Sequence, residues 1–210
     1  MSIRILAMVG SLRAGSYNRQ LAEAAVKHAP DGIDVAIFEG LAEVPLYNED
    51  LDLPGDVPGP AQALRDAVQR ADALLLVTPE YNGSIPAGLK NAIDWTSRPF
   101  HSGVIVDKPV AVVGTAGGRY GGARGHEDTR KTARIAGAHV LDDIALSVPR
   151  AAERFASTHP ADDDEVAAAM PEALAMLAAA ARANTEAASQ QPRHVAALVA
   201  ERSHKQGGVQ

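Results

Sequence analysis

The sequence predicts an α/β domain built on a doubly wound, five-stranded parallel sheet with helices on both faces. Short apolar runs alternate along the chain with longer segments whose apolar residues recur at helical spacing. The run at residues 73–77, ALLLV, has no polar residue, which is typical of a strand buried on both faces. Loops of unusual composition follow three of the runs. Because the carboxyl ends of parallel strands meet at one edge of a sheet, we expect these loops to lie together and to hold a ligand.

The predicted elements follow one another in strand–helix order. The strands are residues 3–9, 33–38, 73–77, 109–114 and 139–148. The first helix presents Leu21, Ala22, Ala25, Val26 and Ala29 on one face. Pro60 and Pro86 begin the next two helices, because proline suits the first helical position. A fourth helix is expected to end near Ala138, and a fifth to span residues 164–182 behind aspartates that suit a helix N-terminus.

The connection at residues 40–60 is long and is rich in proline, glycine and acidic residues. A loop of this length inside a compact domain is usually functional or part of an interface. Its central acids, Glu49 and Asp50, are either solvated or accept hydrogen bonds from a neighbouring subunit.

Length and composition favour one domain followed by a tail. The chain has 210 residues, of which 46% are hydrophobic, enough for a sizeable core. We assign residues 1–183 to the domain. Residues 184–210 are polar and alanine-rich, so we expect them to be largely disordered apart from a short helix at residues 194–202.

The same composition excludes several classes of function. A formal net charge of -6 argues against a nucleic-acid groove, which needs a basic face. The absence of cysteine excludes disulfide scaffolds, thiolate metal sites and cysteine nucleophiles, and the seven histidines form no metal-binding pattern. No apolar run approaches the length of a membrane span, and the start lacks the order of a signal peptide. We therefore expect a cytoplasmic protein without metal, nucleic-acid or membrane partners.

The loop at residues 10–18, GSLRAGSYN, lies between the first strand and the first helix. Free N–H groups and the positive end of the helix dipole point at whatever lies above the sheet there, and Arg13 adds a full charge. A nucleotide triphosphate loop is excluded because Ser16 stands in place of its lysine, and a dinucleotide fingerprint because Leu12 replaces its second glycine. The loop is either a phosphate cradle or a simple helix cap.

Four segments in the right order resemble the NAD(P)H-dependent FMN reductases, a group that includes bacterial quinone, chromate and azo-dye reductases. They are residues 10–18, residues 45–50 (PLYNED), residues 78–95 (with TPEYNGSIP and LKNAIDW) and residues 121–124 (GGAR). The likeness covers about residues 3–182. The resemblance implies a flavodoxin-like fold with strand order 2-1-3-4-5, bound FMN, NADPH or NADH as hydride donor, and a homodimer or homotetramer.

The resemblance also implies which residues contact the cofactor. The FMN phosphate would be held by Ser11, Arg13, Ser16, Tyr17 and Asn18. The isoalloxazine would be bordered by Pro79, Glu80, Tyr81, Asn82 and Gly83 on one side and by Thr115, Gly117 and Gly118 on the other. Some relatives place hydroxyl residues where this sequence has Ala116 and Gly117, so contacts there would come from the backbone.

Elementary chemistry agrees with these roles. Reduction places negative charge on a flavin, which preorganised backbone donors stabilise well. Hydride transfer needs two stacked rings about 3 to 3.5 Å apart and no protein acid or nucleophile. We therefore assign no catalytic side chain, and we predict a two-electron reductase of quinone, flavin, azo or similar small acceptors. Basic residues near the site favour NADPH over NADH.

Some interpretations stay open at this point. Tyr81 either lies beside the flavin or caps the sheet, and Trp95 packs either in the core or at a subunit interface. Arg124 contacts either the NADPH phosphate or a carboxylate of a neighbouring subunit. An alternative function is a flavodoxin-type electron carrier with protein partners, and a third is a binding module that has lost its cofactor.

Overall fold

The computed structural model describes residues 2–206, with side chains to residue 187. Its strands are β1 (Ile3–Val9), β2 (Ile33–Ile37), β3 (Ala73–Val77), β4 (Pro109–Thr115), β5 (His139–Val140) and β6 (Ser147–Val148). Its α-helices are α1 (Tyr17–Lys27), α2 (Gly59–Arg70), α3 (Ala87–Thr96), α4 (Ala123–Ile135), α5 (Ala151–Arg154) and α6 (Asp164–Gln206). Single 3₁₀ turns lie at Leu41–Glu43, Glu49–Leu51 and Pro160–Asp162.

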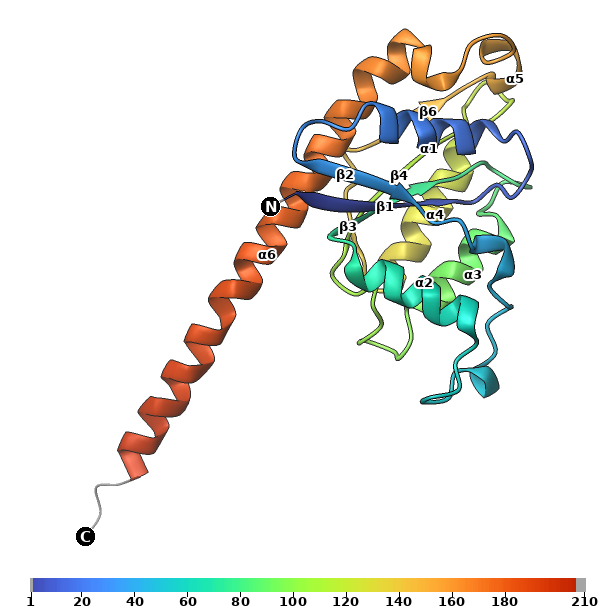
Figure 1. The fold of residues 1–210 in the computed structure, drawn as a ribbon. Coiled ribbons are helices and arrows are strands. Elements are labelled where there is room, and N and C mark those ends of the chain that lie inside the picture. The colour runs from blue at the N-terminus through green and yellow to red at the C-terminus, as the bar shows by residue number, and fades with distance from the viewer. Residues whose placement is uncertain (1, 207–210) are drawn as a thin grey trace.

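The sheet is parallel throughout and has the order β2-β1-β3-β4-β5, with β6 also pairing with β4 (Figure 1). This confirms the predicted flavodoxin-like fold. Every residue of β3 and β4 is buried, as expected for central strands covered on both faces.

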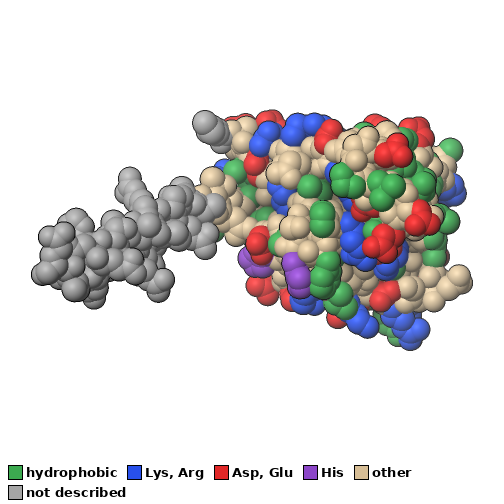
Figure 2. All heavy atoms as spheres, turned by 90° about the horizontal axis from the view of Figure 1, so that it is seen from below, with side chains coloured by type: hydrophobic (Ala, Val, Ile, Leu, Met, Phe, Trp, Pro, Cys, Tyr) green, Lys and Arg blue, Asp and Glu red, His purple; other side chains and the backbone are tan. Residues whose placement is uncertain are grey.

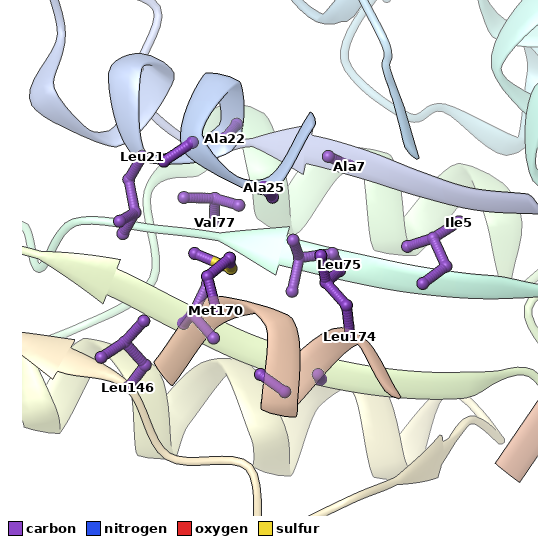
Figure 3. Close-up of a cluster of buried hydrophobic side chains, with 14 of the residues drawn as sticks. Ile5, Ala7, Leu21, Ala22, Ala25, Leu75, Val77, Leu146, Met170 and Leu174 are labelled. Atoms are coloured by element: carbon purple, nitrogen blue, oxygen red, sulfur yellow. The ribbon is translucent and has the colours of Figure 1, made fainter. Parts of the chain in front are cut away.

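Two apolar layers cover the sheet. Helices α1 and α6 pack on one face, where Leu21 of α1 and Met170 and Leu174 of α6 meet Leu75 and Val77 of β3 (Figure 3). Helices α2, α3 and α4 cover the other face, with residues such as Leu64, Leu89 and Ala133 in a second cluster. Each layer buries one face of the strands, so the carboxyl edge is held rigidly from both sides.

The prediction of one fifth strand at residues 139–148 is wrong. Two short strands, β5 and β6, pair with opposite ends of β4, and residues 142–145 between them form no backbone hydrogen bond with β4. Consecutive aspartates in that segment disfavour a strand. The guanidinium of buried Arg130 donates to the Val112 and Ile144 carbonyl oxygens at 3.0 and 3.3 Å, so a side chain bridges the gap.

Helix ends also differ from the predicted ones. Helix α4 ends at Ile135, shortly before Gly137, which has φ +97°. Helix α6 begins at Asp164, as expected, and runs to Gln206, past the boundary that we assign at residue 183. The division into residues 1–183 and a C-terminal segment stays a prediction. Residues 207–210 of that segment lie outside the described part of the chain.

By length and composition, the part of α6 at Asp164–Ala187 is apolar enough to cross a membrane. Its apolar residues have another explanation, because Val166, Met170, Leu174 and Leu177 are fully buried against the sheet. A helix with one face in the core of an α/β domain needs such a composition.

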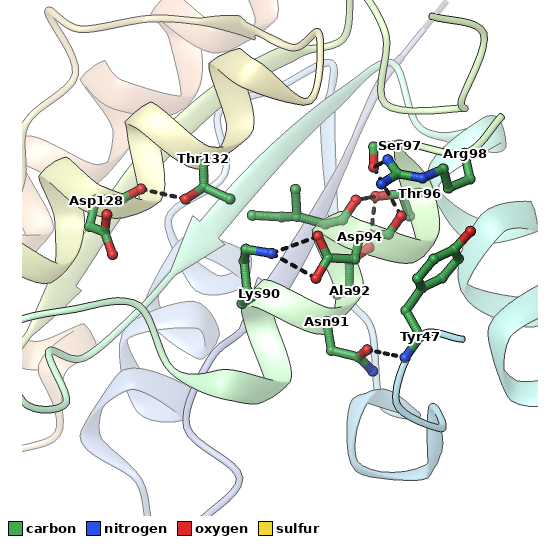
Figure 4. Close-up of polar contacts among 11 residues, drawn as sticks. Tyr47, Lys90, Asn91, Ala92, Asp94, Thr96, Ser97, Arg98, Asp128 and Thr132 are labelled. Carbon is green, nitrogen blue, oxygen red and sulfur yellow. Dashed lines mark hydrogen bonds and ion pairs between the residues drawn. The ribbon is translucent and has the colours of Figure 1, made fainter. Parts of the chain in front are cut away.

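The long loop at residues 40–58 is fastened to α3 (Figure 4). The Asn91 side chain accepts from the Tyr47 N–H at 2.8 Å and donates to the Pro45 carbonyl at 2.9 Å. The indole N–H of Trp95 donates to the same carbonyl at 2.7 Å, so this tryptophan packs within the chain. The loop is therefore an ordered part of the domain.

Candidate functional site

The three loops singled out in the sequence meet at the carboxyl edge of the sheet. The Ser11 and Tyr81 hydroxyls, from the loops after β1 and β3, lie 3.5 Å apart. Asn18, at the start of α1, donates to the Thr115 carbonyl at 2.8 Å and accepts from the Thr115 N–H at 3.0 Å. These two Asn18–Thr115 hydrogen bonds join the start of α1, directly after the first loop, to the end of β4. All three loops therefore border one site.

The loop after β1 is a turn lined with free donors. Ser16 caps α1, since its hydroxyl accepts from the Arg19 N–H at 3.4 Å. In the described part of the chain, the N–H groups of residues 11–15 donate to no backbone or side-chain acceptor. Arg13 is exposed; its guanidinium donates to the Ala14 carbonyl at 3.1 Å and lies 5.8 Å from the centre of the Tyr17 ring. Such a turn suits a phosphate dianion.

The loop after β3 is a tight hairpin that presents Tyr81. Tyr81 and Ser84 exchange two backbone hydrogen bonds, at 3.1 and 3.0 Å, across Asn82 and Gly83. Both central residues have positive φ, +54° and +78°, the geometry that Asn-Gly favours. Asp128 of α4 holds the hairpin by accepting from the Ser84 hydroxyl, and this bond lowers the pKa of the Asp128 carboxyl. Tyr81 itself stays about half exposed at the rim.

Glu80 is engaged by α4. Its carboxylate accepts from the N–H groups of Arg124 and Gly125 at 3.1 and 3.3 Å, at the N-terminus of the helix. An acidic side chain is favourable at that end of the dipole. The carboxylate therefore fixes the loop after β3 to α4.

The loop after β4 lines a cavity of about 570 Å³, together with Glu80, Tyr120 and Arg124. A β-carbon on Gly117 or Gly118 would meet nothing within 4 Å, so their backbone faces open space. The loop is held from behind, because the N–H groups of Arg150 and Ala151 donate to the Gly118 and Ala116 carbonyls at 3.2 and 3.1 Å. A flat ring could approach this backbone closely.

Sequence reasoning missed His126, which lies beneath the loops and is fully buried. Its Nε2 is 2.9 Å from the Thr78 carbonyl oxygen and its Nδ1 is 2.7 Å from the Ser147 hydroxyl. Since a carbonyl only accepts, Nε2 carries the proton, and a neutral ring then accepts at Nδ1. His126 thus links the loop after β3 to β6. No local pattern marks a histidine as a link of this kind.

Burial has the largest effect on the pKa of His126 and lowers it; the hydrogen bond to the Thr78 carbonyl opposes this in part, the nearby charge of Arg130 lowers the pKa further, and Glu80 raises it slightly. The unfolded chain takes up this proton at a pH near 6.5, before the folded chain does. Above that pH the titration of His126 does not change the free energy of unfolding. As the pH drops from there toward the pKa of the folded chain, the free energy of unfolding falls by up to about 1.4 kcal/mol per pH unit.

We expect His126→Gln, whose amide does not titrate, to lose less stability than the wild type between pH 7 and pH 5. Urea unfolding at both pH values measures the difference. Matched pH slopes for the two proteins would show that His126 does not carry this dependence. His101→Gln, at an exposed position, is the control and should keep the wild-type slope.

The structure places all thirteen predicted site residues at this edge, but not all of their side chains face outward. Asn18 and Thr115 are buried and bonded to each other's segment, and the Thr115 hydroxyl donates to the Val148 carbonyl at 2.7 Å. Pro79 and Ser16 are also buried. These four residues shape the site, whereas Arg13 and Tyr81 remain exposed at the rim.

Comparison with known proteins agrees with this geometry. The family model described as NADPH-dependent FMN reductase matches residues 3–153, which include all three loops. The chain belongs to this FMN reductase family. It is 38% identical over 153 residues, 73% of the chain and 81% of the relative, to an NAD(P)H-dependent FMN reductase of Pseudomonas aeruginosa. It is 39% identical over 122 residues, 58% of the chain and 64% of the relative, to a quinone reductase of Escherichia coli.

Among solved structures, this FMN reductase family member resembles the flavoenzyme NAD(P)H:(acceptor) oxidoreductase of Paracoccus denitrificans. The TM-score is 0.72 at 30% identity, with 86% of this chain and 96% of that chain covered. The predicted family, fold and FMN cofactor are thereby confirmed.

The residues present fit FMN. Besides residues 11–15, the N–H groups of residues 117–120 donate to no backbone or side-chain acceptor in the described part of the chain. The first set lies on the loop after β1, and the second borders the open cavity after β4. FMN carries one phosphate and a ring edge of oxygen and nitrogen acceptors, so the two sets of donors match its two polar ends.

Proposed function

We propose that this chain is a two-electron reductase that takes hydride from NADPH or NADH and passes electrons through bound FMN to quinones or similar small acceptors. The observation that carries the proposal is the open face of the site, where the backbone of Gly117 and Gly118 borders a cavity of about 570 Å³. A small molecule can reach a ring placed there, so donor and acceptor can use the same face in turn.

In this proposal FMN supplies the redox chemistry when bound, and the protein supplies placement. The loop after β1 binds the phosphate through its free N–H groups and Arg13. The Tyr81 hairpin, fixed by Asp128, orients one side of the ring. The free N–H groups of residues 117–120 lie where they can stabilise negative charge on the ring edge. No side chain has to give or take a proton during hydride transfer.

Anaerobic titration of the FMN-loaded protein tests the proposal. Either nicotinamide should bleach the flavin absorption band, and a quinone added afterwards should restore it. A bound flavin that neither nicotinamide reduces would instead indicate an electron carrier with protein partners. A protein that takes up no FMN would indicate a binding module without cofactor.

We further propose that the protein is cytoplasmic and forms a homodimer or homotetramer. Phe100 and Ile135, exposed to 70% and 72%, line a hollow of about 310 Å³ beside α3 and α4, and large exposed apolar side chains together favour an interface. Light scattering of the purified protein measures the oligomeric state, and Ile135→Glu should shift it toward the monomer. A wild-type monomer would contradict this proposal.

A further inference from the structure

Four exposed arginines near the site have no carboxylate partner among the described residues. They are Arg13, Arg119, Arg124 and Arg150. None of them forms an ion pair within the described residues, whereas five arginines elsewhere do, for example Arg4 with Asp72 and Arg134 with Asp142. On the face in Figure 2, acidic and basic side chains lie side by side. Although the chain has a net charge of -6, the described residues therefore leave these four cations unpaired at the cofactor site.

Three of these arginines flank the loop after β4. The N–H of Arg150 donates to the Gly118 carbonyl at 3.2 Å, and Arg119 follows Gly118 directly. Arg119 donates to the Tyr120 hydroxyl, and its guanidinium lies 4.5 Å from the centre of the Tyr120 ring. Arg124 and Tyr120 line the same cavity as Gly118. The fourth, Arg13, lies on the loop after β1 beside Tyr17.

The backbone conformation of Arg150 supports a role for its position. It has φ +54°, a region that a residue other than glycine, asparagine or aspartate rarely adopts. Strained positions of this kind persist where the surrounding structure fixes them, and they are found often at ligand sites. Here the bond to Gly118 fixes Arg150 next to the cavity loop.

The charges of the two ligands account for the number of arginines. The phosphate of FMN is met by the donors of the loop after β1 and by Arg13. Glu80 is the acidic residue lining the cavity, and the N–H groups of α4 already occupy one of its carboxylate oxygens. Arg119, Arg124 and Arg150 therefore remain available to a second, polyanionic ligand. A dinucleotide donor brings a pyrophosphate, and NADPH brings a further phosphate on its adenosine ribose.

We propose that Arg119, Arg124 and Arg150 bind the 2′-phosphate on the adenosine ribose of the donor and thereby select NADPH over NADH. The inference rests on the proposed reductase function and names the donor specificity of the same site. A guanidinium binds a phosphate through paired, charge-assisted hydrogen bonds, and these three guanidinium groups form no ion pair within the described residues that would compete.

Adenosine phosphates that cannot reduce flavin test the subsite directly. With the FMN-loaded protein, calorimetry should show 2′,5′-ADP binding at least about tenfold more tightly than 5′-ADP. Arg119→Ala, Arg124→Ala and Arg150→Ala should each lower the affinity for 2′,5′-ADP about tenfold, since the loss of one hydrogen bond to a charged group lowers an affinity by about tenfold or more. Binding of 5′-ADP should change much less.

Arg70→Ala is the matched control. Arg70 is exposed and without an ion pair among the described residues, but it lies in the last turn of α2, before β3 and so at the opposite edge of the sheet. It should leave both affinities unchanged. Equal FMN content in all variants shows that the three arginines do not act through the cofactor.

Turnover provides the second measurement. Arg119→Ala, Arg124→Ala and Arg150→Ala should each lower kcat/KM for NADPH and leave kcat/KM for NADH nearly unchanged. Equal losses with both donors, or equal affinities of the wild type for 2′,5′-ADP and 5′-ADP, would overturn the proposed specificity while the reductase function stands. Failure of both donors to reduce bound flavin would instead overturn the reductase function.

Discussion

Gly114→Ala is expected to lower the free energy of unfolding by about 3 kcal/mol, at the upper end of the effect of overpacking a core. A β-carbon on Gly114 would lie 2.0 Å from the Thr78 carbonyl oxygen and 2.5 Å from Nε2 of His126. The first of these atoms belongs to the backbone of the neighbouring chain segment, so relief requires β3 and β4 to move apart. Thermal or urea unfolding of the variant measures the loss.

The same substitution should also damage the site. The Thr78 carbonyl is the acceptor of the His126 ring and directly precedes the loop that carries Glu80 and Tyr81. Displacing it moves that loop relative to the cavity, so FMN affinity should fall together with stability. Gly59→Ala is the control, because a β-carbon there meets nothing within 4 Å and its φ is ordinary. A Gly114→Ala protein as stable as the wild type would show that β3 and β4 can move apart at this point at little cost in free energy.

Much of the fold could be predicted because its signals are local. The unbroken apolar run of β3 identified a strand buried on both faces, and Pro60 and Pro86 marked the starts of α2 and α3 to within a residue. The position of the fifth strand beside β4 could be predicted, but its interruption could not be predicted, because the Arg130 side chain bonds to β4 across the gap. A long-range contact of this kind leaves no periodicity in either segment.

The site shows the same division. Its loops could be located because glycines, prolines and polar residues follow three apolar runs. The direction in which each side chain points could not be predicted, because it depends on partners that are distant in the sequence. Asn18 and Thr115 are 97 residues apart and bind each other. Glu80, as a further example, caps a helix that begins more than 40 residues later. The sequence therefore predicts which loops form the site better than which side chains face the ligand.

Arg13→Ala is expected to weaken FMN binding by about tenfold or more, because a guanidinium–phosphate contact is charge-assisted and contributes about 1.5 to 3 kcal/mol. The fold should be unaffected. Arg13 is exposed, and its guanidinium contacts only the adjacent Ala14 carbonyl and the Tyr17 ring among the described residues. Flavin content after extensive dialysis, with the dissociation constant from fluorescence, measures the loss, and unchanged circular dichroism and melting temperature show that folding is intact.

Two further variants separate charge from geometry at this position. Arg13→Lys keeps the charge but loses the planar pair of donors, so its FMN affinity should lie between those of the wild type and Arg13→Ala. Arg70→Ala removes an equivalent exposed charge from the opposite edge of the sheet and should retain FMN fully. Added salt should weaken FMN binding more in the wild type than in Arg13→Ala, since one screened charge pair is missing from the variant. If Arg13→Ala keeps its flavin through dialysis, the free N–H groups of residues 11–15 hold the phosphate without help from this side chain.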